Sequence, residues 1–222
     1  MTHDSRSLDG ASHRLVGALR GKNIFRQGDP VEAVYRVESG CVRLQLEDES
    51  GGRQVIAFVY PGHTFCVGLE THWASADAVT DTVLTRFANT SLWTLIAQDS
   101  RAAMALLFSA DALVTELARH LGRLSHLGAY QRLTWFLDWV ANQGAATEPR
   151  VIDLPMSRQD IADFLAIAPE TVSRLFRRKE MSGELSRAGR RRYRYEPHAR
   201  QRRDAPFPVS LRREPAAFYA GA

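Results

Sequence analysis

The spacing of hydrophobic residues changes once along the chain, and this change constrains the fold more than any other feature. From residue 24 to about residue 88 they alternate with polar residues, as in Val42, Leu44 and Leu46, and turn signals such as "QGD", "ESG" and "PGH" interrupt the run. Alternation with period two is typical of short antiparallel strands. From residue 99 the spacing becomes three and four, which is typical of amphipathic helices. The sequence therefore predicts an α+β fold, with a β domain before a helical part.

A long helix is predicted by the stretch "DSRAAMALLFSADALVTELARHLGRLSHLG". Its apolar stripe consists of Leu113, Leu117, Leu121 and Leu124. The stripe is too apolar for a helix that faces water and long enough for a coiled-coil seam. We expect it to be the interface of a homodimer, although packing only on the chain's own β domain is the alternative. A second amphipathic helix, "AYQRLTWFLDWVANQG", ends at Gly144 before the loop "AATEPR".

Two short helices joined by a tight turn are predicted by residues 157 to 180, "SRQDIADFLAIAPETVSRLFRRKE". Ser157 and Asp160 match a capping box, so the first helix begins at Arg158. Pro169 fits the first turn of the second helix, where its missing N–H costs nothing. The residues expected to face inward are Ile161, Ala162, Leu165, Val172, Leu175 and Phe176.

The outward face of the second helix is polar and basic. It carries Glu170, Thr171, Ser173, Arg174, Arg177 and Arg178. Two crossing helices of this kind fit the major groove of B-DNA, where Arg can donate two hydrogen bonds to guanine and Glu can accept from cytosine. We predict that Glu170, Ser173 and Arg174 read bases. A solvated, charged helix face is the alternative.

A basic β-hairpin, or wing, is predicted by "GELSRAGRRRYRY", which follows directly. The residues predicted to contact the DNA backbone are Ser157, Arg158, Thr171, Arg177, Arg178, Arg190, Arg191 and Arg192. Residues 151–222 carry 15 basic and 9 acidic side chains, whereas residues 1–150 carry 14 and 16. Such asymmetry is typical of a polyanion-binding module joined to a near-neutral one. The sequence therefore predicts double-stranded DNA as a partner.

The combination of "IFRQGDPVEAVYRVESGCVRL", a long helix and "DLPMSRQDIADFLAIAPETVSRLFRRKEMSGELSRAGRRRY" resembles the CRP/FNR family of bacterial transcription regulators, most of all its FixK-like branch. The resemblance covers residues 24 to about 195. It implies an N-terminal cyclic-nucleotide-binding-type antiparallel β-roll, a long dimerisation helix, and a C-terminal winged helix-turn-helix that binds a palindrome and contacts RNA polymerase. We expect a transcription regulator that acts as an activator.

The expected domain boundaries follow from this resemblance and from composition. They are a β-roll effector or sensor domain at 1–100, the dimerisation helix and a connecting helix at 101–145, the winged helix-turn-helix at 146–195, and a flexible basic tail at 196–222. The tail is rich in proline and arginine without periodicity, which is typical of disorder and adds non-specific affinity for DNA.

The resemblance also implies a target sequence. Glu170, Ser173 and Arg174 lie on the positions that read bases in this family, and their combination resembles the FNR and FixK branch, whose sites look like TTGAT-N4-ATCAA. The cyclic-AMP branch has Gly in place of Ser173 and Arg in place of Pro169. A dimer on a TTGAT-type palindrome is therefore expected.

Departures from the family limit the signals that the chain can sense. No cysteine precedes Cys41, which excludes the N-terminal iron–sulfur cluster of the FNR oxygen sensors. The stretch "FCVGLETHWASADAVTD" has no Arg and places Ala74 before Ser75, so a buried cyclic phosphate would lack a cationic partner. Cyclic AMP is therefore not expected as the effector, no cofactor is expected, and the effector is unknown. Lys179 also stands where the family usually has an apolar residue.

The cysteines and histidines show no pattern typical of a metal site. Cys41 and Cys66 are expected to be packed thiols, with redox sensing as the alternative. His120 and His126 are six residues apart, which does not place them on one helix face as metal ligands. Haem or metal sensing by His63 or His72 stays open.

Other classes of protein have little support in the sequence. No phosphate loop, nucleophile elbow or paired-carboxylate motif is present, so an enzyme is not expected. The absence of a secretory signal and of a run of about 18 apolar residues predicts a cytoplasmic protein without membrane contact. The rival hypothesis is a small-molecule-gated binding or enzyme-regulatory protein that acts through the β-roll.

Overall fold

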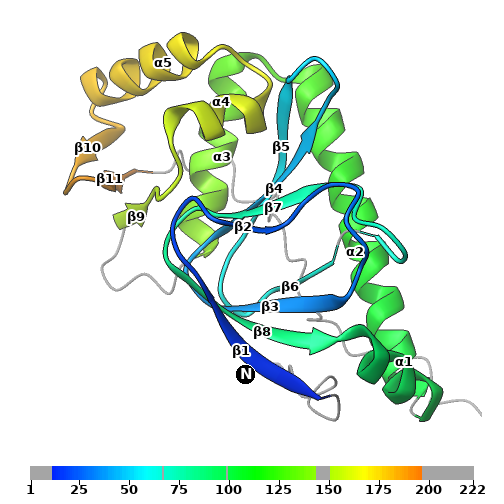
Figure 1. The fold of residues 1–222 in the computed structure, drawn as a ribbon. Coiled ribbons are helices and arrows are strands. Elements are labelled where there is room, and N and C mark those ends of the chain that lie inside the picture. The colour runs from blue at the N-terminus through cyan, green and yellow to red at the C-terminus, as the bar shows by residue number, and fades with distance from the viewer. Residues whose placement is uncertain (1–11, 67, 99, 144–150, 197–222) are drawn as a thin grey trace, which may run out of the picture.

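The computed structural model describes residues 12–66, 68–98, 100–143 and 151–196, apart from some side chains between residues 100 and 113 and that of Gln143 (Figure 1). Two four-stranded antiparallel sheets form the N-terminal β-roll, in the orders β1-β8-β3-β6 and β2-β7-β4-β5. The strands are β1 His13–Ala18, β2 Asn23–Phe25, β3 Ala33–Ser39, β4 Val42–Glu47, β5 Arg53–Val59, β6 Thr64–Phe65, β7 Ser75–Ala78 and β8 Thr82–Ala88.

The alternation in the sequence explains how these strands pack. Val42 and Leu44 of β4 face the inside of the roll, whereas Arg43 between them lies on the opposite face. The turn before β4 requires Gly40, which has a φ of 91° and whose missing Cβ would lie 2.5 Å from Thr82 Oγ1. The predicted antiparallel β domain is confirmed. The strand β1 precedes residue 24, where the alternation begins, because it is a largely exposed edge strand with almost no alternation to reveal it.

Three helices follow the β-roll. They are α1 Asn89–Gln98, α2 Ser100–His126 and α3 Ala129–Gln143. The long helix predicted from the leucine stripe is therefore confirmed as α2. Leu133, Phe136 and Leu137 of α3 lie in the same core as Ile161 and Leu165 of the C-terminal part, so α3 packs as part of that domain. Within the described ranges, none of the helices combines the length and the hydropathy of a membrane span.

The C-terminal part is a winged helix-turn-helix, as predicted. It consists of β9 Val151–Asp153, α4 Arg158–Leu165, α5 Pro169–Met181, β10 Leu185–Arg187 and β11 Arg192–Tyr195, with the sheet order β10-β11-β9. The capping box is present, because Ser157 Oγ accepts a hydrogen bond from Asp160 N and the Asp160 side chain accepts one from Ser157 N. Gly144 with its loop, and residues 197–222 of the predicted tail, lie outside the described residues.

The two domains share an aromatic contact that we call the domain joint. It consists of Phe58 of β5, His120 of α2, Trp135 and Trp139 of α3, and Phe164 of α4. Phe164 is central, with ring centroids 4.4 Å from His120, 5.4 Å from Phe58 and 5.9 Å from Trp139. The first helix of the helix-turn-helix is therefore packed directly on the β-roll and on α2.

Candidate nucleic-acid interface

The helix α5 presents one polar face to solvent, because its opposite, apolar face is buried in the core. Val172, Leu175 and Phe176 are buried, as predicted from the sequence. Pro169 occupies the first position of the helix, where its fixed φ suits the turn. The exposed face carries Glu170, Ser173, Arg174, Arg177 and Arg178, with Thr171 half-buried beside them.

The turn between α4 and α5 is held from outside. Ala166 caps α4 in the left-handed conformation, with a φ of 50°. Arg132 of α3 donates hydrogen bonds to the carbonyl oxygens of Leu165 at 2.9 Å and of Ala166 at 3.2 Å. The same guanidinium donates to Leu124 O, near the end of α2, at 2.6 Å. One arginine therefore ties the long helix to the turn of the helix-turn-helix.

The three residues predicted to read bases lie together on the exposed face of α5. Ser173 Oγ donates to Pro169 O at 3.0 Å, one turn back along the helix. Arg174 Nη2 lies 3.5 Å from Thr171 Oγ1, the outer limit of a hydrogen bond, so its guanidinium is only weakly held within the chain. Glu170 is exposed in the first turn. This arrangement can offer donors and an acceptor to base edges.

Of the eight residues predicted to contact phosphates, Thr171 is half-buried beside Arg174, and the other seven fall into two groups. Arg177, Arg178, Arg190 and Arg192 are exposed and therefore accessible to a polyanion. The other group has structural roles, which the sequence analysis missed. The guanidinium of Arg158 lies 3.3 Å from the centre of the Phe176 ring and donates to Tyr193 Oη at 2.8 Å. Burial lowers the pKa of Arg158 below its usual value.

Two more members of the predicted phosphate set are also held within the fold. Arg191 Nη1 donates to Pro155 O at 2.9 Å, and Ser157 caps α4. Arg158 and Arg191 together join the helix-turn-helix to the wing. Arg158 lies on α4 and donates to Tyr193 of β11, whereas Arg191 lies just before β11 and donates to Pro155, which precedes α4. These side chains therefore support the exposed surface more than they extend it.

A buried ion pair joins the recognition helix to the wing. Lys179 is fully buried, and its Nζ donates to Glu184 Oε2 at 2.7 Å while lying 4.2 Å from the centre of the Tyr130 ring. Glu184 also accepts hydrogen bonds from Tyr130 Oη at 2.8 Å and from Ser182 Oγ at 2.8 Å. Burial raises the pKa of Glu184, but the hydrogen bonds and the charge of Lys179 outweigh it and lower the pKa to about 2.

The sequence contained one signal for this ion pair. Lys179 departs from the apolar residue usual in the family, and a buried lysine requires an acidic partner nearby. Gly183, with a φ of 75°, turns the chain back after α5 so that Glu184 can reach Lys179. Without the turn geometry, however, several acidic residues were equally good candidates.

The residues considered for sensing lie within the β-roll, and most of them are buried. Ala74 and Ser75 are buried, and Ser75 Oγ accepts a hydrogen bond from Gln27 N at 3.0 Å. His72 is buried and stacked on Phe25 with ring centroids 3.6 Å apart. His63 lies 3.1 Å from Tyr60 O through its Nδ1. In the described part of the chain, no group of three or more His, Cys, Asp or Glu side chains is arranged to hold a metal ion.

The two cysteines differ in their surroundings. Cys41 is buried, and burial raises the pKa of its thiol well above the usual value. Cys66 is half-buried, and its Sγ lies 3.2 Å from Gly68 O. A buried thiol with a raised pKa carries little thiolate, which makes Cys41 unreactive.

The apolar stripe of α2 differs in detail from the prediction. Leu107, Val114 and Leu121 are 61%, 65% and 66% exposed and lie seven residues apart, which places them on one face. Leu117 and Leu124 are half-buried within the chain, and the side chain of Leu113 lies outside the described residues. Heptad spacing was the signal that could have identified Leu107 and Val114.

Comparison with known proteins places both domains. The family model of the cyclic nucleotide-binding domain matches residues 18–99, and that of bacterial regulatory proteins, crp family, matches residues 154–183. The nitrogen fixation regulation protein FixK of Rhizobium meliloti is 37% identical over 167 residues, which cover 73% of this chain and 74% of the relative. The transcriptional activator protein anr of Pseudomonas aeruginosa is 30% identical over 197 residues, covering 84% and 79%.

Solved structures show the same similarity. The structure of FixK2 from Bradyrhizobium japonicum has a TM-score of 0.79 and 28% sequence identity, and covers 83% of this chain and 93% of that chain. The matches therefore extend over the β-roll and the helix-turn-helix alike.

Proposed function

Because the chain belongs to the CRP/FNR family of bacterial transcription regulators, and is similar to its FixK members, we propose that it binds a TTGAT-N4-ATCAA-like palindrome as a homodimer. As a member of this family it is a DNA-binding transcription regulator. We propose that Glu170, Ser173 and Arg174 read the bases and that Arg177, Arg178, Arg190 and Arg192 contact phosphates. The observation that carries the proposal is the exposed polar face of α5, opposite a buried apolar face.

The arrangement of the helices supports a dimer. The exposed line of Leu107, Val114 and Leu121 has the heptad spacing of a two-stranded seam. In Figure 1, α5 lies near the end of α2 that carries its C-terminus. A two-fold axis along α2 therefore brings both copies of α5 to the same end of the dimer, as a palindromic site requires.

We propose that DNA binding does not need cyclic AMP. Ala74 and Ser75 are buried in the β-roll where the cyclic-AMP branch has an Arg-Ser pair, so a cyclic phosphate at this position would lack a guanidinium partner. We also propose that the dimer acts as an activator that contacts RNA polymerase, since a relative with 30% identity is a transcriptional activator by name.

The first prediction separates base reading from phosphate attraction. Arg174→Ala and Glu170→Ala should each weaken binding to the palindrome by about 1–3 kcal/mol per half-site and leave binding to a scrambled duplex unchanged. Arg190→Ala should weaken binding to both duplexes and make the salt dependence shallower by about one unit of slope. Titration of each duplex at several salt concentrations measures these effects. The same titration with cyclic AMP should give unchanged affinities, because the proposed DNA binding does not need it.

The matched control is Arg26→Ala, which removes an exposed arginine of the β-roll, outside the helix-turn-helix and the wing. If Arg174→Ala lowers the affinities for palindrome and scrambled duplex equally, Arg174 does not read bases. If the wild type shows no preference for the palindrome, the proposed target is wrong, and a binding role of the β-roll becomes the better hypothesis.

A further inference from the structure

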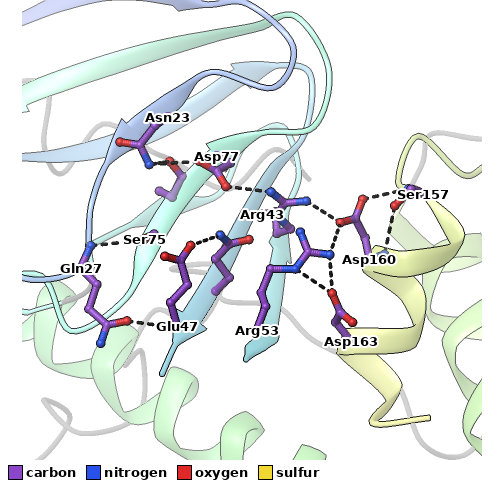
Figure 2. Close-up of polar contacts among 12 residues, drawn as sticks. Asn23, Gln27, Arg43, Glu47, Arg53, Ser75, Asp77, Ser157, Asp160 and Asp163 are labelled. Carbon is purple, nitrogen blue, oxygen red and sulfur yellow. Dashed lines mark hydrogen bonds and ion pairs between the residues drawn. The ribbon is translucent and has the colours of Figure 1, made fainter. Parts of the chain in front are cut away.

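A network of ion pairs joins the β-roll to the first helix of the helix-turn-helix (Figure 2). Arg43 of β4 forms an ion pair with Asp160 of α4, and Arg53 of β5 lies 3.0 Å from the same carboxylate. Arg53 Nε also donates to Asp163 Oδ2 at 2.7 Å. We call these four residues the interdomain clasp. Its arginines lie more than 100 positions before its aspartates in the sequence, so the clasp exists only when the two domains are docked.

Contacts within the β-roll orient the guanidinium of Arg43. Arg43 Nη2 donates to Asp77 Oδ2 on the neighbouring strand β7 at 2.7 Å, and Asp77 Oδ1 accepts from Asn23 Nδ2 at 3.0 Å (Figure 2). Asp77 and Asn23 therefore fix the guanidinium of Arg43 from behind. A guanidinium that is already oriented loses less conformational freedom when it binds a second carboxylate.

On the other side, the clasp includes Asp160, the third residue of α4. Asp160 supplies the carboxylate of the capping box. The group that orders the first turn of α4 therefore also forms ion pairs with Arg43 and Arg53. Burial raises the pKa of Asp160, but hydrogen bonds from Ser157 and the charges of Arg43 and Arg53 outweigh it and lower the pKa. Asp160 therefore keeps its negative charge at neutral pH.

The clasp leaves the base-reading face open. In Figure 1, α4 lies between α5 and β5, so α5 is on the side of the domain away from the β-roll. Ile161 and Leu165 of α4 share one core with Val172 and Phe176 of α5, which makes the two helices a single packed unit. Fixing α4 against the β-roll therefore fixes the direction in which α5 points.

The domain joint packs apolar surface but, among the residues described, leaves some buried polar atoms without partners. Within the described residues, four buried polar atoms of the joint and of the neighbouring Tyr60 have no hydrogen-bond partner: Tyr60 Oη, His120 Nδ1, Trp135 Nε1 and Trp139 Nε1. In the same part of the chain, Arg43 Nε of the clasp is also without a partner, although both terminal nitrogens of the same guanidinium are paired. Buried polar atoms without partners destabilise the state that buries them, since water would satisfy them in an open state. The clasp adds a second attraction between the domains, made of ion pairs.

We propose that Arg43, Arg53, Asp160 and Asp163 are positioning residues that hold the helix-turn-helix in its DNA-binding orientation without a bound effector. This inference rests on the proposed function, because it concerns how the palindrome-reading face is oriented. The two copies of α5 in a dimer must enter successive major grooves, about 34 Å apart, so a domain that swings freely lowers affinity for a palindrome even when each α5 is intact.

The experiment uses charge exchange between Arg53 and Asp163. Arg53→Asp and Asp163→Arg should each lower the affinity of the dimer for the palindrome about tenfold, and the double variant should recover most of it. The substitutions avoid Asp160, because its loss would also remove the cap of α4. Affinity for a scrambled duplex should change less than affinity for the palindrome in both single variants. Circular dichroism and sedimentation of every variant show whether fold and dimer are intact.

The matched control is Arg36→Gln, which removes an ion pair of similar length, 2.7 Å to Glu38, that lies within β3 of the β-roll. It should leave affinity for the palindrome unchanged. If the wild type prefers the palindrome but a folded, dimeric Arg53→Asp binds it as tightly, or if the double variant recovers nothing, the clasp does not position the domain. If the wild type itself has no preference, the proposed function fails, which is a different result.

Discussion

A single buried charge, that of Lys179, joins two elements of the C-terminal domain. Lys179 is 0% exposed, yet it lies on the recognition helix of a DNA-binding domain, where lysines usually face phosphate. Its ammonium group is instead used to hold Glu184, and through it the first strand of the wing. The wing is therefore tied to α5 by a charge that is buried within the chain.

Glu184 should make the stability of the protein depend on pH in the acid range. Its pKa is lowered from 4.5 to about 2, so its contribution is fully present above pH 4.5 and is lost as the pH falls toward about 2. Urea unfolding at pH 5 and pH 3 should show a smaller loss of stability in Glu184→Gln than in the wild type. Glu49→Gln, an exposed carboxylate in a turn, is the control and should keep the wild-type dependence.

The turn of the helix-turn-helix contains a removable strain. Ala166 has a φ of 50°, a conformation that costs residues with a Cβ about 1 kcal/mol and glycine nothing. Ala166→Gly should therefore stabilise the protein by about 0.5 kcal/mol, after the added flexibility of the unfolded chain is subtracted. Ala141→Gly, inside α3, should instead destabilise it by about 1 kcal/mol. Equal destabilisation by both variants in urea unfolding contradicts the argument.

At the scale of elements, the helices that carry local signals were predicted well. The capping box and Pro169 marked the beginnings of α4 and α5 correctly, since both signals lie within a few residues of the boundary they set. The stripe of α2 was predicted less well. Leu117 and Leu124 are apolar and correctly spaced, but they are partly covered by the chain itself, which periodicity alone cannot show.

The exposed line of α2 predicts how the dimer can be broken. Val114→Glu together with Leu121→Glu should place charges in the seam and shift the protein to monomers at micromolar concentration, at a cost of several kcal/mol. Arg119→Gln, which changes an exposed residue of the same helix off this line, should leave the dimer intact. Analytical ultracentrifugation measures both, and a dimer that survives the double substitution would place the interface elsewhere.

At the scale of the whole molecule, the contacts between the domains were not predictable from the sequence. Arg43 and Arg53 occur in alternating strands, where a charged residue normally indicates a solvated face. Asp160 was correctly assigned to a capping box. That role explained why an acidic residue stands at this position, so nothing in the sequence indicated a second partner for it. The ion pairs between them follow from tertiary packing across more than 100 residues, which leaves no periodic signal.

The domain joint should respond to mild acid through His120. Burial between α2, α3 and α4 lowers the pKa of His120 from 6.5 to about 4, with Arg123 and Arg132 adding to the effect against the hydrogen bond to Phe164 O. Because the unfolded chain takes up the proton first, stability falls as the pH decreases from about 6.5 toward 4. The charged neighbour Glu116, buried on α2, is paired with Arg123.

His120→Gln should reduce this pH dependence in urea unfolding between pH 7 and pH 5. His126→Gln, an exposed histidine of the same helix, should not change it. If the wild type and His120→Gln lose stability equally over this range, the buried imidazole does not control the joint.

The tryptophans are divided between the joint and the surface. Trp135 and Trp139 are 8% and 3% exposed in the domain joint, whereas Trp73 and Trp93 are 41% and 54% exposed. An indole in apolar surroundings emits at shorter wavelength than one in water, so the intrinsic fluorescence has a blue component from the joint and a red component from the surface. Replacing Trp73 and Trp93 with Phe leaves an emission spectrum that reports docking of the two domains, in real time and without a label.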